Sequence, residues 1–573
     1  MTAYRWLGAL AVVLSVSGPV ACGNSAGDLN DGGDQGSSSS SGGESSSGSS
    51  TGGNSSSSSS GGKSSSSSSG SGGNSASSSS GSSSSSSGGA VHDAGASSSS
   101  SGSSSSGGAR DAGPASSSSS SSSGGSSSSS SSSSGAAVDG GSGALCAGDT
   151  ALPAQPTIPP ACTTLTASQT VSATGVPSET TLDTARIQAA LTGCASGHAV
   201  RLTTTGSMNA FITGPITIPS NVTLWVDTGV TLYGTRNPSV YGSAAGLITA
   251  KGGNQGVMGA GIIDGQGGEP MIGGSGSFWD QNGNGGTSPA LIVVSGATNF
   301  TLYQITLHNS PMFHVKLSSA GFMVWGVTIK TPSKATNSAG TALTPTSAHN
   351  TDGIDPGETA SNGYIVCSNI SDGDDHIAIK GGTNVNHLTI AHNHFLAGHG
   401  MSIGSEVTNV SDINVYDLSI DGTTSGFGGG SSNGIRIKGD PTTGGPPGVT
   451  NVTYSDVCVR NLANPILLTP RYTSATGTMI PMFTGITIRN FHAIAATLIP
   501  TVTIDGFDSS HITGITLDNV VIDGSKNISA TEANVTLGPG AVNFTPTGTG
   551  VTVTNNQSGT STPNPCTNKF ITF

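Results

Sequence analysis

Charged side chains are scarce in this sequence of 573 residues, because Asp, Glu, Lys and Arg together make up only 9% of it. The apolar stretch from Trp6 to Val16 is too short to span a bilayer. The cysteines show no CxxC spacing, which gives no support to a zinc site. A membrane-spanning protein and a zinc-bound domain are therefore not expected.

Residues 1–21 have the features of an export signal. Arg5 lies near the start, the apolar stretch follows, and small residues precede Cys22. Cys22 is a candidate lipid-attachment cysteine of a bacterial lipoprotein, although Pro19 stands where such signals usually carry Leu. We therefore expect an exported protein that is either attached to the cell surface through Cys22 or secreted in free form.

Residues 22–145 consist mainly of Ser and Gly, with almost no apolar side chains to bury. Such a segment cannot offset the entropy cost of becoming ordered, so we expect a flexible linker. A flexible chain of about 110 residues has an r.m.s. span of roughly 55–60 Å. The segment therefore fits a spacer that holds a folded domain away from a cell surface; the alternative is a low-complexity insert without a role.

The cysteines that follow the linker are even in number, which suggests disulfides in an exported chain. Six cysteines allow 15 connectivities, so their number alone does not define the pairing. Cys162 and Cys194 flank the first recognisable helix, and we expect them to be bonded to each other. The six cysteines are Cys146, Cys162, Cys194, Cys367, Cys458 and Cys566.

Residues 146–573 are predicted to form one folded domain that is built almost entirely of short strands. Residues 183–191 show the one clear helical pattern, and we expect this short helix to cap an end of the strand stack. The strands are rich in β-branched residues and are separated by Gly, Asn and Asp. We expect them at residues 222–226, 300–307, 322–329, 364–370, 388–395, 413–420 and 452–459.

Apolar positions recur between these strands every 22–25 residues. Leu302 aligns with Val324, Ile365 with Leu388, and Leu388 with Ile413. A period of this length with Asn-rich turns predicts an all-β solenoid, a parallel β-helix whose coils stack along one axis. A β-sandwich would show shorter spacing and hairpin turns, so it is the weaker interpretation.

Acidic residues return with nearly the same period. Asp375 follows Asp352 by 23 residues, and His399 follows Asp375 by 24. Neighbouring strands lie about 4.7–4.9 Å apart, so these residues should stack on one face of the solenoid, with Asp374 beside them. Crowded carboxylates cannot all ionise easily, so at least one proton should be retained at mildly acidic pH, and the period predicts a carboxylate site built by repetition.

Eight short motifs occur in one order along residues 160–573. They are TRNPSVY at 235–241, GIIDGQG at 261–267, NSPMFHV at 309–315, TIKTPSK at 328–334, NTDGIDP at 350–356, SDGDDHIAIK at 371–380, GHGMSIGSE at 398–406 and NGIRIKGD at 433–440. Together they resemble the polygalacturonases of glycoside hydrolase family 28, most of all the bacterial endo-polygalacturonases. The resemblance implies a right-handed parallel β-helix of the pectate-lyase-like type and hydrolysis of α-1,4 bonds in polygalacturonate with inversion.

The resemblance also implies catalytic roles for four residues, each matched by its motif. Asp374 corresponds to the general acid, and Asp352 and Asp375 correspond to the carboxylates that orient and activate the attacking water. His399 corresponds to the histidine that tunes the acid. Because ionising Asp374 would bring like charges together, we expect it to hold its proton to a higher pH than an isolated aspartate.

Arg436, Lys438 and Tyr472 correspond to substrate-binding residues of the family. Arg436 and Lys438 lie two residues apart in a predicted strand, so their side chains should point the same way toward a substrate carboxylate. The net charge of −13 is unfavourable for attracting a polyanion over long range, so local cations, including Lys380, should bind it. The expected partner is polygalacturonate or pectin, bound by a monomer without a cofactor, a metal ion or nucleic acid.

Two features depart from the family pattern. His376 and Phe395 stand where many fungal relatives have two cysteines, which indicates the loss of a disulfide. Residues 337–349 look like an insertion just before Asp352, and a loop there could cover part of the cleft and limit endo action.

Each candidate residue also has an ordinary interpretation. Asp352 could form a turn with Gly353, the pair Asp374 and Asp375 could be solvated or bind a cation, and His399 could be a turn residue. Arg436 and Lys438 could be a solvent-facing strand. The alternative functions are a calcium-dependent pectate lyase, a rhamnogalacturonan hydrolase and a non-catalytic carbohydrate-binding surface protein.

Overall fold

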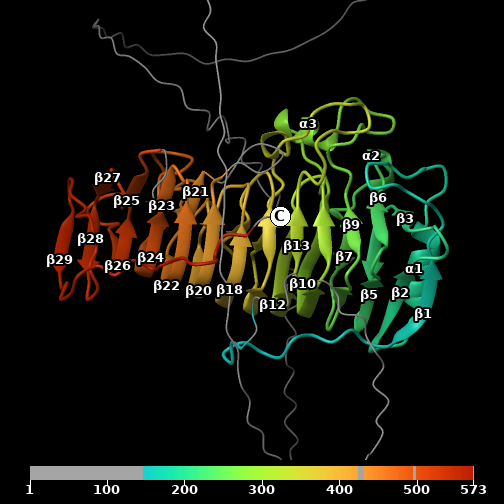
Figure 1. Ribbon diagram of the computed structural model, residues 1–573, viewed down its shortest axis with the longest axis horizontal. Coiled ribbons are helices and arrows are strands. Elements are labelled where there is room, and N and C mark those ends of the chain that lie inside the picture. Colours follow the sequence, from blue (N-terminus) through green and yellow to red (C-terminus); the bar gives the residue numbers. More distant parts are fainter. Residues whose placement is uncertain (1–145, 147, 424–431, 495–497, 572–573) are drawn as a thin grey trace, which may run out of the picture. The chain divides into compact units, whose positions relative to one another are not determined.

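The computed structural model describes residues 146, 148–423, 432–494 and 498–571. The predicted export signal, Cys22 and the Ser/Gly linker lie outside the described residues. Strands dominate the described part and stack side by side along one axis, as Figure 1 shows. The pairings between named strands are parallel, which agrees with the predicted parallel β-helix.

The strands form three columns, one on each side of the coil. Column 1 contains β4 (Ile216–Ile218), β7 (Gly246–Ala250), the first residues of β10 (Ala290–Tyr303) and β12 (Val315–Trp325), β14 (Ile354–Pro356), β17 (Ile377–Ile379), β19 (Met401–Ile403), β21 (Asn433–Lys438), β23 (Asn464–Thr469), β25 (Thr501–Asp505) and β27 (Asn527–Thr531).

Column 2 contains the longest strands. They are β1 (Ala161–Thr166), β2 (His198–Thr203), β5 (Val222–Val226), β8 (Gly256–Met258), the last residues of β10 and β12, β15 (Ser361–Val366), β18 (Val385–Phe395), β20 (Asn409–Asp421), β22 (Gly448–Arg460), β24 (Phe483–Ile494), β26 (Thr513–Ile522), β28 (Ala533–Leu537) and β29 (Thr552–Asn555).

Column 3 is made of short strands and of strand ends that continue from column 2. Its members are β3 (Ala210–Thr213), β6 (Thr231–Gly234), β9 (Ile262–Asp264), β11 (Thr306–His308), β13 (Thr328–Lys330), β16 (Asn369–Ser371) and the last residues of β18, β20, β22, β24 and β26.

Alternation along each short strand places apolar side chains inside the coil and polar ones outside. In column 1, Ile354, Ile377, Met401, Ile435 and Ile466 lie in register and are fully buried. Burying one such side chain contributes roughly 1.5–3 kcal/mol, and the core repeats this contact on every coil. The residues between them point outward, and in this column they build the candidate site.

A ladder of left-handed residues forms the bend between columns 2 and 3. Backbone φ values near +55° at these positions turn the chain sharply after each column 2 strand, and Asn, Asp, Gly and His tolerate this conformation better than most residues. The ladder, one residue per coil, consists of Gln304, Gly326, Cys367, His392, Asp417, Asp456, Asn490 and Asn519.

The predicted register is correct for two of the three aligned pairs. Leu302 pairs with Val324 and Leu388 with Ile413. Ile365 pairs with Ile390 and not with Leu388, so that prediction was wrong by two residues. A shift of two residues keeps the same side chains on the inner face, which is why the alignment still predicted the period.

Helices are few and short in the described part of the chain. The helix α1 (Thr184–Gly193) packs its buried residues Ile187 and Leu191 on the first coils, as a cap should. The other helical segments are α2 (Pro238–Tyr241), α3 (Phe278–Gly283) and the 3-10 turn η1 (Pro345–Ser347). Among the residues described, no helix is long and apolar enough to cross a membrane.

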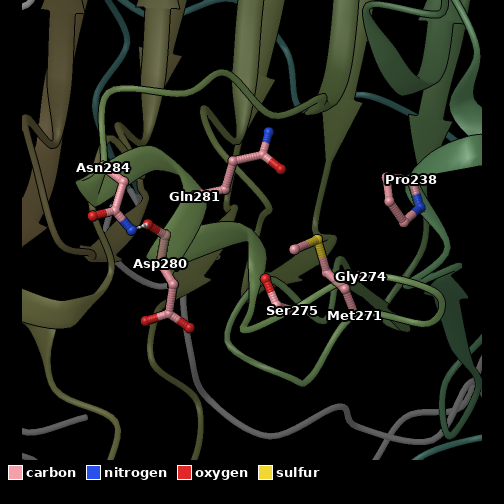
Figure 2. Close-up of a pocket in the computed structure, with 7 residues that line it drawn as sticks. All are labelled: Pro238, Met271, Gly274, Ser275, Asp280, Gln281 and Asn284. Atoms are coloured by element: carbon pink, nitrogen blue, oxygen red, sulfur yellow. Dashed lines mark hydrogen bonds between the residues drawn. The ribbon is translucent and has the colours of Figure 1, made fainter. Parts of the chain in front are cut away.

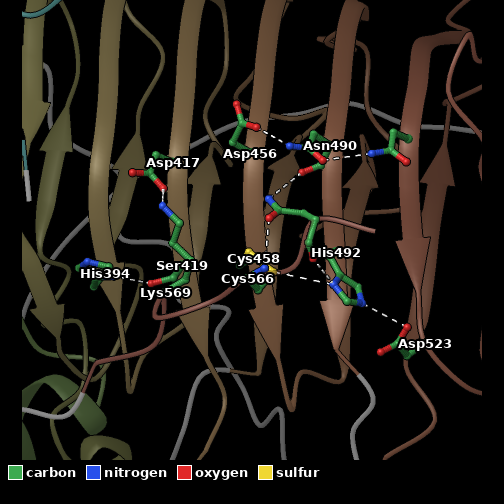
Figure 3. The surroundings of a disulfide bond; sticks show 12 residues. His394, Asp417, Ser419, Asp456, Cys458, Asn490, His492, Asp523, Cys566 and Lys569 are labelled. Carbon is green, nitrogen blue, oxygen red and sulfur yellow. Dashed lines mark hydrogen bonds and ion pairs between the residues drawn. A yellow bond between two sulfur atoms is a disulfide. The ribbon is translucent and has the colours of Figure 1, made fainter. Parts of the chain in front are cut away.

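Three disulfides join the remaining cysteines. Cys162 is bonded to Cys194, the pair that the sequence favours, and this bond fastens β1 to the end of α1. The other two bonds, Cys146–Cys367 and Cys458–Cys566, hold the segments before β1 and after β29 against the middle coils. Figure 3 shows the second of these bonds and the polar contacts around it.

Candidate active site

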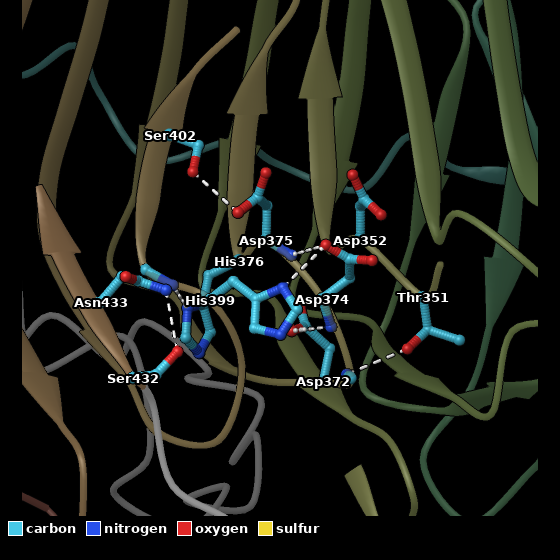
Figure 4. Close-up of polar contacts among 12 residues, drawn as sticks. Thr351, Asp352, Asp372, Asp374, Asp375, His376, His399, Ser402, Ser432 and Asn433 are labelled. Carbon is cyan, nitrogen blue, oxygen red and sulfur yellow. Dashed lines mark hydrogen bonds and ion pairs between the residues drawn. The ribbon is translucent and has the colours of Figure 1, made fainter. Parts of the chain in front are cut away.

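The coils of β14, β17 and β19 bring the predicted acidic residues together. β14 pairs with β17 and β17 with β19 in parallel, and Asp352, Asp375 and His399 each lie two residues before a paired position. The backbone N–H of Gly353 donates to the Asp375 carbonyl (2.9 Å), and the N–H of His399 donates to the Asp374 carbonyl (2.7 Å). The period in the sequence therefore predicted the grouping that Figure 4 shows.

Two glycines allow the loops of this cluster to approach each other. A Cβ atom at Gly373 would lie 2.3 Å from the carbonyl oxygen of Ala348. A Cβ atom at Gly398 would lie 2.6 Å from a carboxyl oxygen of Asp372, and the φ of +143° also disfavours a side chain there. These contacts explain why glycine precedes Asp374 and His399.

Asp375 is buried and ion-paired on both carboxylate oxygens. Its Oδ1 accepts hydrogen bonds from Arg436 (2.9 Å) and from the Ser402 hydroxyl (2.7 Å), and its Oδ2 accepts one from Lys438 (2.7 Å). Burial alone raises the pKa of Asp375, but the charges of Lys438 and Arg436 outweigh burial and hold the pKa well below its usual range. Asp375 is therefore an ionised carboxylate throughout the physiological pH range.

The structure gives the predicted substrate-binding cations an additional task. Arg436 and Lys438 are only 3% and 6% exposed and contact Asp375 directly, so they fix the charge of that carboxylate. A second guanidinium N–H of Arg436 donates to the Tyr472 hydroxyl (2.7 Å). The Tyr472 ring lies 4.9 Å from the Lys438 ammonium and 5.3 Å from the guanidinium carbon of Arg436, and thus packs beside both charges.

Asp374 and His399 form the second charged pair of the site. The Nδ1 atom of His399 lies 3.1 Å from Asp374 Oδ1, which also accepts the backbone N–H of Asp375 at 2.8 Å. The other oxygen, Oδ2, has no hydrogen-bond partner among the described residues and is not a fully buried atom. Asp374 therefore presents one free carboxyl oxygen to the outside of the coil.

The prediction that Asp374 keeps its proton through like-charge repulsion was wrong. Burial raises the pKa of Asp374, but the charge of His399 outweighs it and lowers the pKa below the usual value. Burial lowers the pKa of His399, whereas Asp374 outweighs burial and raises it. The pair therefore holds its proton mainly on the imidazole, because a histidine stands where the sequence argument considered only carboxylates.

Like-charge repulsion acts instead on Asp352. Burial and the charges of Asp374 and Asp355 raise the pKa of Asp352 well above its ordinary value. Among the described residues, its ion-pair partner is Lys380, whose Nζ lies 3.6 Å from Asp352 Oδ2. Asp355, three residues further along the chain, has its pKa raised to about 7 by burial, and its Oδ1 has no hydrogen-bond partner among the described residues. This half of the cluster is thus the half that retains protons.

Sequence reasoning missed three residues that support the cluster. Asp372 is fully buried, accepts the backbone N–H of Asp374 (3.3 Å), and has its pKa raised by burial. The Thr351 hydroxyl accepts the N–H of Gly373 (3.0 Å), and Ser402 donates to Asp375. Ser402 could have been found, because its register partner is Arg436 and both point out of column 1. No pattern in the sequence distinguishes Asp372 from a turn aspartate.

Comparison with known proteins identifies the family. The family model for glycosyl hydrolases family 28 matches residues 168–541. The chain belongs to this family. It is 36% identical over 462 residues to a polygalacturonase of Ralstonia solanacearum, covering 70% of this chain and 86% of that protein. It is 34% identical over 414 residues to an endo-polygalacturonase of Pectobacterium parmentieri, covering 68% and 93%.

A solved structure of the family shares the fold. The polygalacturonase from Erwinia carotovora ssp. carotovora matches with a TM-score of 0.57 and 34% identity, over 67% of this chain and 98% of that one. The chain therefore has the right-handed parallel β-helix that the sequence predicts, and as a family 28 member it is a glycoside hydrolase.

One departure from the family pattern has a structural replacement. The ring of His376 stacks on that of Phe395 with centroids 4.6 Å apart and planes 9° apart. The Nδ1 atom of His376 accepts the N–H of Gly400 (3.0 Å), and burial lowers the pKa of this histidine to about 4. A neutral His376, stacked on Phe395, thus connects the two positions at which the sequence comparison indicated a lost disulfide.

The insertion of residues 337–349 packs against the active-site loops. Leu343 and Ala348 form a small buried cluster with Trp279 of α3, and the N–H of Ser338 donates to Glu269 (2.9 Å). The carbonyl oxygens of Pro345 and Ala348 lie within 2.5 Å of the place that a Cβ atom at Gly373 would occupy. The insertion therefore supports the loop that carries Asp374.

A cavity of about 370 Å³ lies between α2 and α3, and Figure 2 shows its lining. It is lined by Pro238, Met271, Gly274, Ser275, Asp280, Gln281 and Asn284. The one charged side chain among them, Asp280, belongs to the capping box at the start of α3. None of the predicted site residues lines this cavity, and it offers no cation to an acidic sugar.

Asp374, Asp375 and His399 place one potential metal-ligand atom each within 4.8 Å of one another. Both oxygens of Asp375 are already hydrogen-bonded to cationic side chains. A divalent ion at this position would face the charges of Arg436 and Lys438 at close range, which is unfavourable. The donor set therefore suits proton transfer better than metal binding.

Proposed function

We propose that this family 28 enzyme hydrolyses the α-1,4 bonds of polygalacturonate and pectin with inversion, at positions inside the polymer. The observation that carries the proposal is the grouping of Asp374 with Asp352, Asp375 and His399 on three successive coils. These residues combine a proton-holding pair with an ionised carboxylate. Relatives named polygalacturonase and endo-polygalacturonase support the substrate and the endo action.

Asp374 is the proposed general acid, and His399 supplies its proton. The pair shares one proton across the 3.1 Å contact between His399 Nδ1 and Asp374 Oδ1. When that proton moves to the Asp374 carboxylate, His399 becomes neutral and Asp374 can donate a proton to the leaving glycosidic oxygen. Activity should therefore fall on the alkaline side as the pair loses its shared proton, whose retention is favoured by the raised pKa of His399.

Asp352 and Asp375 are the proposed carboxylates for the attacking water. Asp375 stays ionised beside Arg436 and Lys438, so it can orient the water and stabilise positive charge that develops on the sugar ring. Asp352 has the raised pKa, which makes it the better proton acceptor once it is ionised. Activity should therefore also fall on the acidic side, as Asp352 becomes protonated.

Arg436, Lys438 and Tyr472 are proposed to contact the substrate as well as Asp375. Arg436 and Lys438 lie on the outward face of β21, and the Tyr472 ring packs beside both. A substrate carboxylate that approached this edge would meet two cations and a hydroxyl. We propose that the enzyme acts as a monomer, because one chain supplies every residue of this cluster.

An assay of reducing ends on polygalacturonate tests the proposed reaction. We expect new reducing ends in the presence of a chelator, no unsaturated UV-absorbing product, and inverted configuration at the newly formed end. Loss of activity with the chelator together with unsaturated products would indicate a calcium-dependent lyase. A preference for rhamnogalacturonan over polygalacturonate would change the substrate but keep the mechanism.

Endo action has its own test. An endo-acting enzyme should lower the viscosity of a polygalacturonate solution by half when only a small percentage of the bonds is cleaved. Release of monomers with little change in viscosity would show exo action instead. Exo action is expected if one end of the substrate cleft is closed.

We also propose that the enzyme is exported and that residues 22–145 tether it to a cell surface through Cys22. Three disulfides in the described part of the chain support an oxidising compartment. Mass spectrometry of the N-terminal peptide from a membrane fraction should find a lipid on Cys22. An unmodified mature protein in the culture medium would instead indicate free secretion.

A further inference from the structure

The outward side chains of column 1 form a single line along the β-helix, and few of them are charged. Register places Thr249, Val293, Lys316 and Asp355 on successive coils of this line. Further along it, Ala378, Ser402, Arg436, Leu467 and Thr503 follow in the same way. Lys316 is therefore the last charged residue of the line on its N-terminal side, one coil before Asp355.

Lys316 differs from the other cations of this face in having no ion pair. Lys380 contacts Asp352, and Arg436 and Lys438 contact Asp375. In the described part of the chain, no carboxylate lies within ion-pair distance of Lys316. Its ammonium lies 5.4 Å from the centre of the Phe313 ring, and its side chain is partly exposed.

The surroundings of Lys316 do not neutralise its charge. The nearest acid in register is Asp355, whose carboxyl keeps its proton up to the range of pH 7 because burial raises its pKa to about 7. On the other side, Val293 is apolar and 9% exposed. Below about pH 7, where Asp355 is protonated, Lys316 thus presents a positive charge without an ion-pair partner among the described residues on the substrate face.

An acidic polymer requires such a charge, because the chain carries a net charge of −13 and the site itself is rich in carboxylates. We propose that Lys316 binds a uronate carboxylate of the substrate, on the side of the cleaved bond that lies nearer the N-terminal end of the β-helix. We propose that it selects a free acid over a methyl ester at that position. This inference rests on the proposed polygalacturonase function. Electrostatic complementarity of this kind supplies specificity, so the effect should appear as a difference in binding between the acid and its methyl ester.

The test combines a substitution with two ligands. Binding of an acidic galacturonate oligomer and of its methyl ester is measured by calorimetry to Asp374→Asn, which is expected to bind without turnover, and to the same protein with Lys316→Gln. We expect the acidic oligomer to bind about tenfold more weakly after Lys316→Gln, equal to about 1.4 kcal/mol, while the ester changes less than twofold. Lys316→Arg should restore most of the affinity.

Arg489→Gln is the matched control, because it removes the same charge from an exposed position on β24 in column 2. Equal affinity of the acidic oligomer with and without Lys316→Gln would overturn the inference, as would an equal loss for acid and ester. An unchanged thermal unfolding midpoint of Lys316→Gln would exclude a purely structural effect. If wild-type enzyme forms no reducing ends on polygalacturonate, the proposed function itself fails, and the inference about Lys316 fails with it.

Discussion

Two Asp–His clusters lie on neighbouring coils of the β-helix but on different sides of it. The first is the active-site pair of Asp374 and His399. The second, which we call the clasp, lies on the ladder and consists of Asp149, His392, Asp417 and Lys569. His392 bonds to Asp149 through Nε2 (2.8 Å) and to Asp417 through Nδ1 (2.7 Å), and Lys569 pairs with the other oxygen of Asp417.

The clasp is a closed network, whereas the active site is open. In the clasp, both ring nitrogens of His392 and both oxygens of Asp417 have partners. The clasp also joins the segment that precedes β1 to the segment that follows β29, because Asp149 and Lys569 come from opposite ends of the described chain. In the active site, Asp355 Oδ1 is buried and has no hydrogen-bond partner among the described residues.

The pKa shifts also differ between the clasp and the active site. In the clasp, each partner stabilises the charge of the other: the hydrogen bond to Asp417 raises the pKa of His392, and the pKa of Asp417 falls to about 2 because His392 and Lys569 outweigh its burial. In the active site, the pKa of Asp352 rises while that of Asp375 falls. Carboxylates whose environments separate their pKa values can act as acid and base, whereas mutually satisfied charges hold segments together.

The largest expected effect comes from Asp375→Asn. This change removes the carboxylate that orients the water and leaves Arg436 and Lys438 without their anionic partner. We expect kcat on polygalacturonate to fall at least about a thousandfold, or about 4 kcal/mol. Asp421→Asn is the control, because Asp421 is also buried and paired with an arginine, Arg460, but in column 3. Equal losses in both variants would mean that Asp375 acts through folding alone.

A smaller loss is expected for His399→Gln. Without the imidazole, the shared proton and the positive charge that lowers the pKa of Asp374 are both gone, so the pKa of Asp374 should rise. We expect kcat to fall about a hundredfold, or about 2.7 kcal/mol, with a changed alkaline limb of the pH–rate profile. His392→Gln should keep the wild-type profile. A profile of His399→Gln that overlays wild type would remove this residue from the proton relay.

The disulfide Cys146–Cys367 should matter for stability and little for turnover. Cys367 belongs to the ladder, one coil before His392, and the bond fixes the segment before β1 there. Replacing both cysteines by serine should lower the free energy of unfolding by about 2 kcal/mol, while kcat stays within about twofold. Denaturant unfolding and a standard activity assay measure the two quantities. A large loss of kcat would show that this anchor also shapes the active site.

The smallest effect is expected from His392→Gln, and its sign depends on pH. The folded-state pKa of His392 is raised, so its contribution is complete below its unfolded pKa of about 6.5 and is lost as the pH rises through the folded pKa. The folded-state pKa of Asp417 is lowered, so its contribution is present above about pH 4 and is lost as the pH falls toward about 2.

The stability difference between wild type and His392→Gln should therefore be largest between about pH 4 and pH 6.5, at about 1 kcal/mol. Unfolding midpoints at pH 5 and at pH 9 measure it. A difference that is equal at both values, or larger at pH 9, would contradict a protonated His392 in the clasp.

The sequence predicted those features of the active site that depend on the repeat length of the coils. The recurrence of Asp352, Asp375 and His399 defined the grouping in the active site, because residues one coil apart must stack in a solenoid. The ion pairs of Arg436 and Lys438 with Asp375 could not be read in the same way, since they depend on how far each side chain reaches across coils. The sequence therefore predicted which residues lie together but gave the proton to Asp374, whereas the pKa of Asp374 is lowered and that of His399 is raised.

The complete clasp could not have been predicted from the sequence. His392 and Asp417 are one coil apart and in principle visible in the period, but Asp149 and Lys569 reach them from segments that have no repeat. The disulfides from Cys146 and Cys566 have the same origin. Contacts made by non-repeating segments depend on the path of the chain over the surface, and the composition of these segments does not encode that path.

The most direct test compares Asp374→Asn with Asp417→Asn, since both aspartates bond to a histidine and only the first is proposed to be catalytic. We predict that Asp374→Asn lowers kcat at mildly acidic pH at least about a thousandfold, or about 4 kcal/mol, while polygalacturonate still binds. We predict that Asp417→Asn keeps kcat within about twofold of wild type. An Asp374→Asn enzyme that retains more than about a tenth of wild-type kcat, a barrier change below about 1.4 kcal/mol, would contradict the assignment of Asp374 as the acid.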